Sequence, residues 1–249
     1  MTLLRSHPNP LLNSWALPAD VQKARLRYRV MRNVLRLTVT AAWKVRVFNR
    51  HFEPPTGGAI YICNHQSFLD PILMSFALQR PMNYMARDSL FRFPVFKQII
   101  SGFNAFPVKR GSADLGALKE AMRRLKDGGQ VVVFAEGTRT PDARIAPFLP
   151  GVAMLAQRAA AWTVPVVIDG AYEAWPRTQT LPGGGSVVVQ YAPPIPQADA
   201  RTLKPEQFIQ QVRQSIIDMQ TEVRRRVGRS PLDYSLPFAP ADSEQGDAE

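Results

Sequence analysis

A histidine and an aspartate follow a short apolar run in the first half of the chain. His65 and Asp70 stand in the stretch 64–70, directly after residues 59–63, which predict a buried strand. A carboxylate that holds one imidazole nitrogen leaves the other free to take a proton, so the pair suits general-base catalysis. On a regular helix, a spacing of five residues would set the two side chains about 140° apart. The chemistry therefore needs a turn between them.

Both residues also have structural interpretations. Asp70 stands before Pro71, and an aspartate followed by a proline is a ready N-cap for the helix that residues 71–78 predict. His65 on its own fits a loop histidine without a chemical role. The residue types leave these readings open, and Asp70 can serve as both a cap and a partner of His65.

A second motif follows the apolar strand predicted at residues 130–135. Gly137 would let a ligand approach the backbone closely. Thr138 and Arg139 supply a hydroxyl group and a planar guanidinium, which suit a phosphate. A Gly-Thr-Arg turn also occurs in ordinary solvated loops. The basic turn at residues 109–112 could likewise bind a phosphate or be an ordinary charged loop.

The middle of the chain alternates strand and helix patterns, which must position these motifs. Strands are predicted at 59–63, 103–108, 130–135, 164–168 and 186–191, and helices at 71–78, 114–126, 151–161 and 206–227. This alternation predicts an α/β fold with a mixed, partly parallel sheet flanked by helices. The active site should then lie beyond the carboxyl ends of the strands.

The composition excludes several classes of protein. With 249 residues, of which 45% are hydrophobic and 20% charged, the chain is long and apolar enough for one large folded domain. A single cysteine, Cys63, excludes an internal disulfide and a cysteine-based zinc cluster, and favours a reducing cytosol. No run approaches the roughly 20 apolar residues of a membrane span, and no secretory signal is expected in residues 1–20.

The positive charge is concentrated near the N-terminus. The net charge is +11, and residues 21–50 contain nine basic residues and no acid, interleaved with aliphatic side chains and Trp43. This pattern is typical of an interfacial helix on anionic lipid. A helix packed on the main domain and a nucleic-acid-binding arm are the alternatives.

Together, the motifs resemble those of glycerolipid acyltransferases of the 1-acyl-glycerol-3-phosphate acyltransferase type. The resemblance rests on Asn-His-x4-Asp at 64–70, Phe-Pro-Val-x-Arg at 106–110 and Phe-x-Glu-Gly-Thr-Arg at 134–139. Phe-Leu-Pro-Gly at 148–151 and Val-Pro-Val-Val-Ile at 164–168 fit as well. The ordered set runs from about Ala59 to Trp175. Ala135, Lys109 and Leu149 depart from the common family pattern.

The resemblance implies transfer of a fatty acyl group from a thioester to the hydroxyl of lysophosphatidate. His65 would be the general base and Asp70 its orienting partner. The residues that would hold the acceptor's phosphate are Arg110, Glu136, Gly137, Thr138 and Arg139. The co-substrate would be acyl-CoA or acyl-carrier protein, and no cofactor or metal is expected. The implied partners are a phospholipid membrane surface and a lysophospholipid acceptor, with no nucleic acid.

Three alternatives stay open at this stage. The acceptor could be glycerol 3-phosphate or another lysolipid. Cys63 could act as an acyl-accepting nucleophile, since it stands two residues from His65, although a cysteine ending an apolar strand is usually a small buried hydrophobe. A non-catalytic lipid- or nucleic-acid-binding protein is the third, but a pure binder needs no base.

The predicted organisation has three parts. Residues 1–50 form an N-terminal segment with basic amphipathic membrane-surface helices, residues 51–228 form the acyltransferase α/β domain, and residues 229–249 form a flexible tail that is Pro-rich and then acidic. We expect the protein at the cytoplasmic face of the membrane, peripheral or monotopic, without a transmembrane span.

Overall fold

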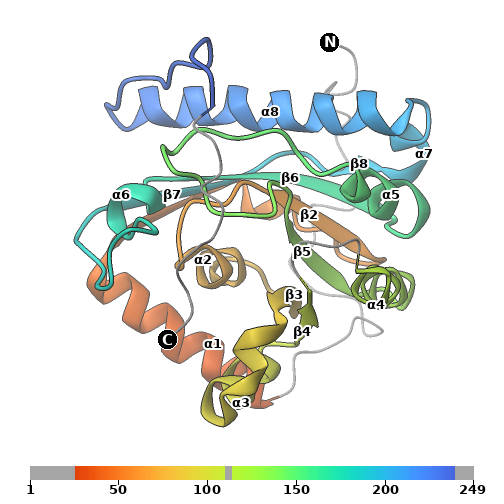
Figure 1. Cartoon of the computed structure of the whole chain (residues 1–249), viewed down its shortest axis with the longest axis horizontal. Helices are drawn as coiled ribbons and strands as arrows, with labels where there is room; N and C mark the ends of the chain where they lie inside the picture. The colour runs from red at the N-terminus through yellow and green to blue at the C-terminus, as the bar shows by residue number, and fades with distance from the viewer. Residues whose placement is uncertain (1–25, 110–113, 239–249) are drawn as a thin grey trace.

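The computed structural model describes residues 26–109 and 114–238, which form one sheet with helices on both faces (Figure 1). The strands are β1 (Lys44–Phe48), β2 (Ala59–Cys63), β3 (Met82–Arg87), β4 (Ala105–Val108), β5 (Gln130–Phe134), β6 (Trp162–Asp169), β7 (Ser186–Tyr191) and β8 (Ile195–Pro196). The helices are α1 (Leu26–Ala42), α2 (Asp70–Phe76), α3 (Pro94–Gly102), α4 (Leu115–Lys126), α5 (Gly151–Arg158), α6 (Ala171–Ala174), α7 (Gln197–Ala200) and α8 (Pro205–Arg226). Two short 3-10 turns complete the set, η2 (Arg50–Phe52) and η3 (Asp88–Arg92).

The sheet is mixed and mostly parallel, as the alternating pattern predicts. Its strand order is β1-β7-β6-β2-β5-β3-β4, and β8 pairs with β6. The strands β6, β2, β5, β3 and β4 run parallel, while β7 and β8 pair antiparallel with β6. Every side chain of β2 is fully buried, because a central strand has neighbours on both edges and helices on both faces.

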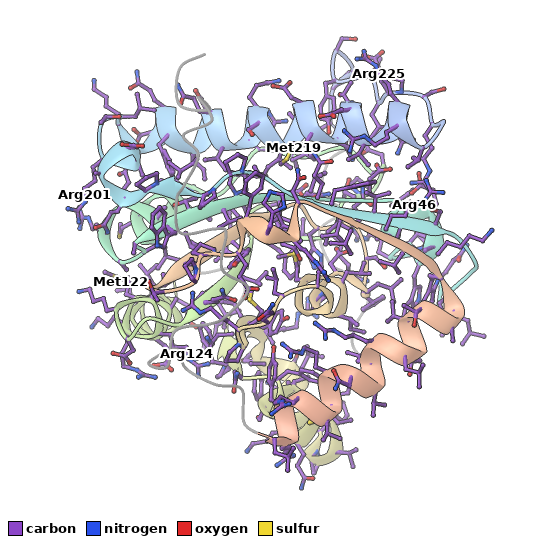
Figure 2. The ribbon with its side chains drawn as sticks, turned by 180° about the vertical axis from the view of Figure 1, so that it is seen from behind. Arg46, Met122, Arg124, Arg201, Met219 and Arg225 are labelled. Carbon is purple, nitrogen blue, oxygen red and sulfur yellow. The ribbon has the colours of Figure 1, made fainter. Side chains whose placement is uncertain are left out.

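The two faces of the sheet support two separate apolar cores. One face packs against α4, α5 and α8, and the other against α2, α6 and Val39 of α1. Alternate residues of β2 divide between them, with Ile60 and Ile62 on the first face and Ala59, Tyr61 and Cys63 on the second. Figure 2 shows that α8 is amphipathic, with Met219 pointing toward the sheet and Arg225 away from it.

The N-terminal basic segment differs from the prediction for residues 1–50. Within the described residues, α1 ends at Ala42, and Lys44–Phe48 form edge strand β1, which pairs in parallel with β7. Lys44, Val45 and Arg46 alternate exposed and half-buried side chains, which is the period of a strand and not of a helix. The sequence pattern predicts helix here because Lys44–Phe48 continues the basic, apolar composition of α1.

The C-terminal segment also differs from the prediction of a flexible tail from residue 229. The Arg229 guanidinium pairs with buried Asp169 at 2.8 Å. The Tyr234 hydroxyl accepts a hydrogen bond from the Ile145 amide at 3.0 Å. Arg144 donates to the backbone carbonyls of Asp233, Leu236 and Pro237. Residues 229–238 therefore pack on the domain, and residues 239–249 lie outside the described part.

None of the helices in 26–109 and 114–238 combines the length and apolar character that a bilayer crossing requires.

Candidate active site

The two motif loops leave neighbouring strands at the same edge of the sheet. Strands β2 and β5 are parallel partners, with Cys63 opposite Phe134 at their carboxyl ends. His65 and Glu136 each stand two residues beyond that paired position. The topology therefore brings the motifs together at the edge where the sequence places the active site.

His65 and Asp70 form the pair that the sequence predicts. His65 Nδ1 lies 2.7 Å from Asp70 Oδ2, with the imidazole 12% exposed and the carboxylate fully buried. The same Oδ2 accepts the backbone N–H groups of Gln66 at 2.6 Å and Ser67 at 2.7 Å. A carboxylate accepts only, so this bond assigns the proton to Nδ1 and leaves Nε2 to act as a base.

The structure also separates the two readings of Asp70. It is the first residue of α2, and the cap position belongs to Leu69, which makes no side-chain capping bond. The Asp70 carboxylate instead turns back over the preceding loop to reach Gln66, Ser67 and His65. This reverse turn supplies the approach that a regular helix would not allow.

The imidazole of His65 is held from the side by an aromatic ring. It stacks on Phe134, with ring centroids 4.2 Å apart and planes 20° from parallel. One ring edge is fixed by Asp70 and one face by Phe134, so few orientations remain for His65. Phe134 begins the Phe-x-Glu-Gly-Thr-Arg motif at the end of β5, but its residue type alone did not indicate that it would hold His65.

The Glu136 side chain connects the two motif loops by hydrogen bonds to backbone amides of this protein. Its Oε1 accepts the amide of His65 and its Oε2 accepts the amide of Ala146, each at 2.8 Å. A third bond, from the Thr140 amide to the His65 carbonyl at 2.8 Å, joins the same loops. Burial raises the pKa of Glu136 to about 8. Because both oxygens bind backbone, these contacts give Glu136 a different task from the phosphate binding that the resemblance implied.

The Gly-Thr-Arg turn lies beside the His65 loop. Gly137 has φ of +75°, and a Cβ there would come within 2.9 Å of Leu149 Cδ1, so the turn itself requires glycine. Thr138 and Arg139 are half-buried. The Arg139 guanidinium lies 3.6 Å over the ring of Phe68, a residue of the His65 loop. Arg110 lies outside the described residues.

Two buried amides anchor the His65 loop, and their tasks were not predicted. The Asn64 side chain donates to the Ile168 carbonyl at 2.9 Å and accepts the Ile168 amide at 2.8 Å. Gln66 donates to the Ala143 carbonyl at 3.1 Å and accepts the Tyr172 amide at 3.3 Å. Short polar residues directly after a fully buried strand were the available signal, because buried amides need partners.

Cys63 has the character of a core residue. It is fully buried in the core beneath the loop, and burial raises the pKa of its thiol well above the usual value. A thiolate nucleophile needs exposure and a lowered pKa. The structure therefore disfavours the alternative in which Cys63 carries the acyl group.

Across 26–109 and 114–238, histidine, cysteine and carboxylate side chains do not gather in groups of three or more that could hold an ion.

The chain is similar to known acyltransferases. A family model described as Acyltransferase matches residues 44–169. A 1-acyl-sn-glycerol-3-phosphate acyltransferase from Chlamydomonas reinhardtii is 32% identical over 183 residues, which cover 70% of this chain and 55% of that protein. One from Bacillus subtilis is 28% identical over 144 residues, covering 57% of this chain and 71% of its own.

The fold has a counterpart among solved structures. The 1-acyl-sn-glycerophosphate acyltransferase PlsC from Thermotoga maritima matches with a TM-score of 0.69 and 24% identity, over 79% of this chain and 80% of that one. The predicted α/β fold is thereby confirmed. This chain spans about half the length of the relatives from Chlamydomonas reinhardtii and Cocos nucifera, 55% and 53%. The family model itself covers half of this chain, and on that basis the chain belongs to the acyltransferase family.

Proposed function

We propose that this protein transfers a fatty acyl group from a thioester donor to the free hydroxyl of 1-acyl-glycerol 3-phosphate, giving phosphatidate. The observation that carries the proposal is the 2.7 Å pair of His65 and Asp70 at the carboxyl edge of the sheet. The names of the relatives support the choice of acceptor.

His65 acts as the general base in this reaction. Its Nε2 takes the proton of the acceptor hydroxyl while that oxygen attacks the thioester carbonyl carbon. The tetrahedral intermediate then collapses, the carbon–sulfur bond breaks, and His65 returns the proton to the thiolate sulfur. Asp70 keeps the proton on Nδ1 and stabilises the imidazolium between the two steps, and a base positioned in this way contributes about 10²–10⁴-fold to the rate.

The phosphate of the acceptor is held by Arg139 and Arg110, with Gly137 and Thr138 in the same turn. The position of the Arg139 guanidinium over Phe68, a residue of the His65 loop, supports this assignment because it places a cation close to His65. Glu136 is a positioning residue, since it fixes the backbone of His65. The donor is acyl-CoA or acyl-carrier protein, and the net charge of +11 suits either anionic partner.

We further propose that the protein works at the cytoplasmic face of a membrane, bound through α1. Leu26, Val30, Val34 and Leu37 are 53–73% exposed and fall within about 80° of the helix circumference. Tyr28, Arg32 and Val39 bury the opposite side of α1 against the domain. An exposed apolar stripe on a helix without acidic residues is typical of interfacial binding to anionic lipid.

The test is an acceptor panel with purified protein and its His65→Ala variant. Lysophosphatidate, glycerol 3-phosphate, lysophosphatidylcholine and a monoacylglycerol are offered with acyl-CoA or acyl-carrier protein, and products are read by mass spectrometry. We expect wild type to acylate lysophosphatidate best and the monoacylglycerol least. His65→Ala should lose about 10²-fold or more and keep the melting curve of wild type. Activity of this variant within about tenfold of wild type would contradict the base assignment.

A further inference from the structure

Helix α3 is an apolar helix that the domain does not bury. None of its nine residues, Pro94–Gly102, is buried. Phe93, directly before the helix, is 66% exposed, and Val95, Phe96 and Ile99 are 74%, 45% and 45% exposed. A helix this short is marginal in water unless an apolar face is covered. The exposed side chains therefore need a partner.

The helix lies beside α1 on the same side of the sheet. The Arg27 guanidinium of α1 approaches the Gln98 carbonyl at 3.4 Å, and Tyr28 meets Phe103 edge-to-face at 5.7 Å. Both helices lie on the side of the sheet away from α8 (Figure 1). We call their exposed apolar residues the α1–α3 face, which comprises Leu26, Val30, Val34, Leu37, Phe93, Val95, Phe96 and Ile99.

This face has a cationic border. Arg27, Arg29, Arg92 and Lys97 are exposed around it. The sequence has no acid between positions 21 and 50 or between 89 and 113. A cavity of about 710 Å³ opens between the two helices, and its lining includes Arg27, Asn83, Lys97, Ser101 and Asn104. Cations and neutral hydrogen-bond donors beside exposed apolar groups match the chemistry of an anionic lipid surface.

We propose that α3 is a second membrane-insertion element, which enters an anionic bilayer together with α1 and fixes the tilt of the domain on the membrane. The inference rests on the proposed membrane location and adds a segment that neither the charge pattern nor the motifs indicated. In this arrangement Phe93, Val95, Phe96 and Ile99 enter the acyl region, and Arg27 and Lys97 contact lipid phosphates at the cavity.

Charge argues against one other candidate occupant of this face, and composition argues against a second. A second copy of the chain would bring one cationic border against another, which is unfavourable. The acidic residues 239–249 have the right charge but contain no large apolar side chain that could cover Phe96 or Ile99. An anionic bilayer supplies both the charge and the apolar phase.

The first experiment compares two double variants of the full chain by vesicle flotation. Phe96→Gln/Ile99→Gln removes apolar groups from α3, and Leu115→Gln/Met154→Gln removes exposed apolar groups from α4 and α5, on the opposite layer. With phosphatidylglycerol–phosphatidylcholine vesicles, we expect the α3 variant to bind on the order of tenfold more weakly, equivalent to about 1.4 kcal/mol. The control should float like wild type. Wild-type flotation of the α3 variant would overturn the proposal.

A catalytic readout separates this proposal from the proposed function. In detergent micelles that present lysophosphatidate, Phe96→Gln/Ile99→Gln should transfer acyl groups at the wild-type rate, whereas His65→Ala should fail there and still float. The α3 proposal is supported if wild type and Phe96→Gln/Ile99→Gln are equally active in micelles and only the variant floats poorly. Absence of activity in wild type would count against the proposed reaction alone.

A second measurement reports insertion directly. Cys63 is fully buried, so Val95→Cys can be labelled with a polarity-sensitive dye at the new position. Its emission should shift to the blue with phosphatidylglycerol vesicles, and the same dye on Met154→Cys should not respond. An unshifted Val95→Cys probe overturns the proposal. So does a dimer in solution that Phe96→Gln/Ile99→Gln dissociates, since it would assign the face to a second copy.

Discussion

The His65 loop and the α1–α3 face satisfy their side chains in opposite ways. In the loop, the polar side chains of Asn64, Gln66 and Asp70 are buried and bonded to groups of this same chain. On the face, apolar side chains such as Leu26 and Val95 are 73% and 74% exposed. The polar groups of the His65 loop find their partners within the fold, and the apolar side chains of the α1–α3 face need a partner outside it.

The long helix on the other layer shows that exposure of the α1–α3 face is not a general property of this chain. Eight of the fourteen large apolar side chains exposed in the described residues belong to that face, and none belongs to α8. Along α8, Met219 points to the sheet and Arg225 to solvent (Figure 2). The apolar side chains of α8 thus face the sheet, whereas those of the α1–α3 face are exposed. Substitutions in the His65 loop should therefore change catalysis, and substitutions on the α1–α3 face should change membrane binding.

The largest expected effect follows from Asp70→Asn. Asp70 Oδ2 accepts the amides of Gln66 and Ser67 as well as the His65 Nδ1 proton, so the oxygen of asparagine would take its place. The negative charge that stabilises the imidazolium would then be lost. We expect kcat to fall about 10²-fold or more with unchanged flotation on anionic vesicles. The measurement is steady-state kinetics with chemical denaturation of the same samples.

A matched control is available at the far end of the domain. Glu53 is a half-buried carboxylate that also accepts two backbone amides, those of Gln79 and Arg80, at 2.7 and 2.8 Å. Glu53→Gln should lose stability like Asp70→Asn and keep kcat. Equal loss of kcat in both variants would mean that Asp70 acts through folding and not through His65.

An intermediate effect is expected for Glu136→Gln. A glutamine has one oxygen acceptor, so one of the His65 and Ala146 amides would face an NH₂ group. At pH 4.5, where the ionisation of Glu136 does not yet lower the stability of wild type, we expect a loss of about 1–3 kcal/mol in the free energy of unfolding, because a buried donor loses its partner. Urea titrations of wild type and variant give this number, and an unchanged midpoint would mean that the two amides find other acceptors.

The same residue gives a signed pH dependence. Burial raises the pKa of Glu136 to about 8, above the value of 4.5 for an ordinary glutamate. Between these values the folded protein holds more protons than the unfolded chain, so this group's contribution makes unfolding easier as pH rises from about 4.5 to 8. Glu136→Gln should flatten the profile over that interval. A slope as steep as in wild type would assign the dependence to other groups.

The fold was predictable where residue patterns were strong and local. The strand at Ser186–Tyr191 has the predicted bounds, and the Val-Val-Val-Phe run at 131–134 lies in a central strand. Strand β3 was missed because Asn83 and Arg87 interrupt the apolar residues of Met82–Arg87, which lacks the aliphatic run of β5. Helix α3 was also missed, because its nine residues are a short window for a helical pattern.

The site was predictable in its residues and only partly in their tasks. The residue types indicated that His65 and Asp70 could act together, although their spacing required a turn between them. The turn that closes them to 2.7 Å depends on the backbone amides of Gln66 and Ser67. The task of Glu136 depends on the amide of His65, 71 residues away. No local pattern encodes a bond to a backbone group that far along the chain.

The smallest expected effect concerns α1. Deleting residues 1–50 would remove β1 from the sheet together with the buried Tyr28 and Val39, so point variants are the cleaner test. We expect Leu26→Gln/Leu37→Gln to weaken binding to anionic vesicles by about tenfold and to leave transfer in micelles unchanged. Asn33→Gln/Thr40→Gln, at exposed polar positions of the same helix, should bind like wild type.

Salt distinguishes the two parts of this binding. Screening at physiological ionic strength limits charge interactions to about 8 Å, so wild-type binding should fall as salt rises, while the apolar stripe keeps a residual share. Because Leu26→Gln/Leu37→Gln removes apolar groups and no charge, its remaining binding should be more sensitive to salt than that of wild type. Identical salt curves for both proteins would show that α1 binds by charge alone, and its exposed stripe would then need another explanation.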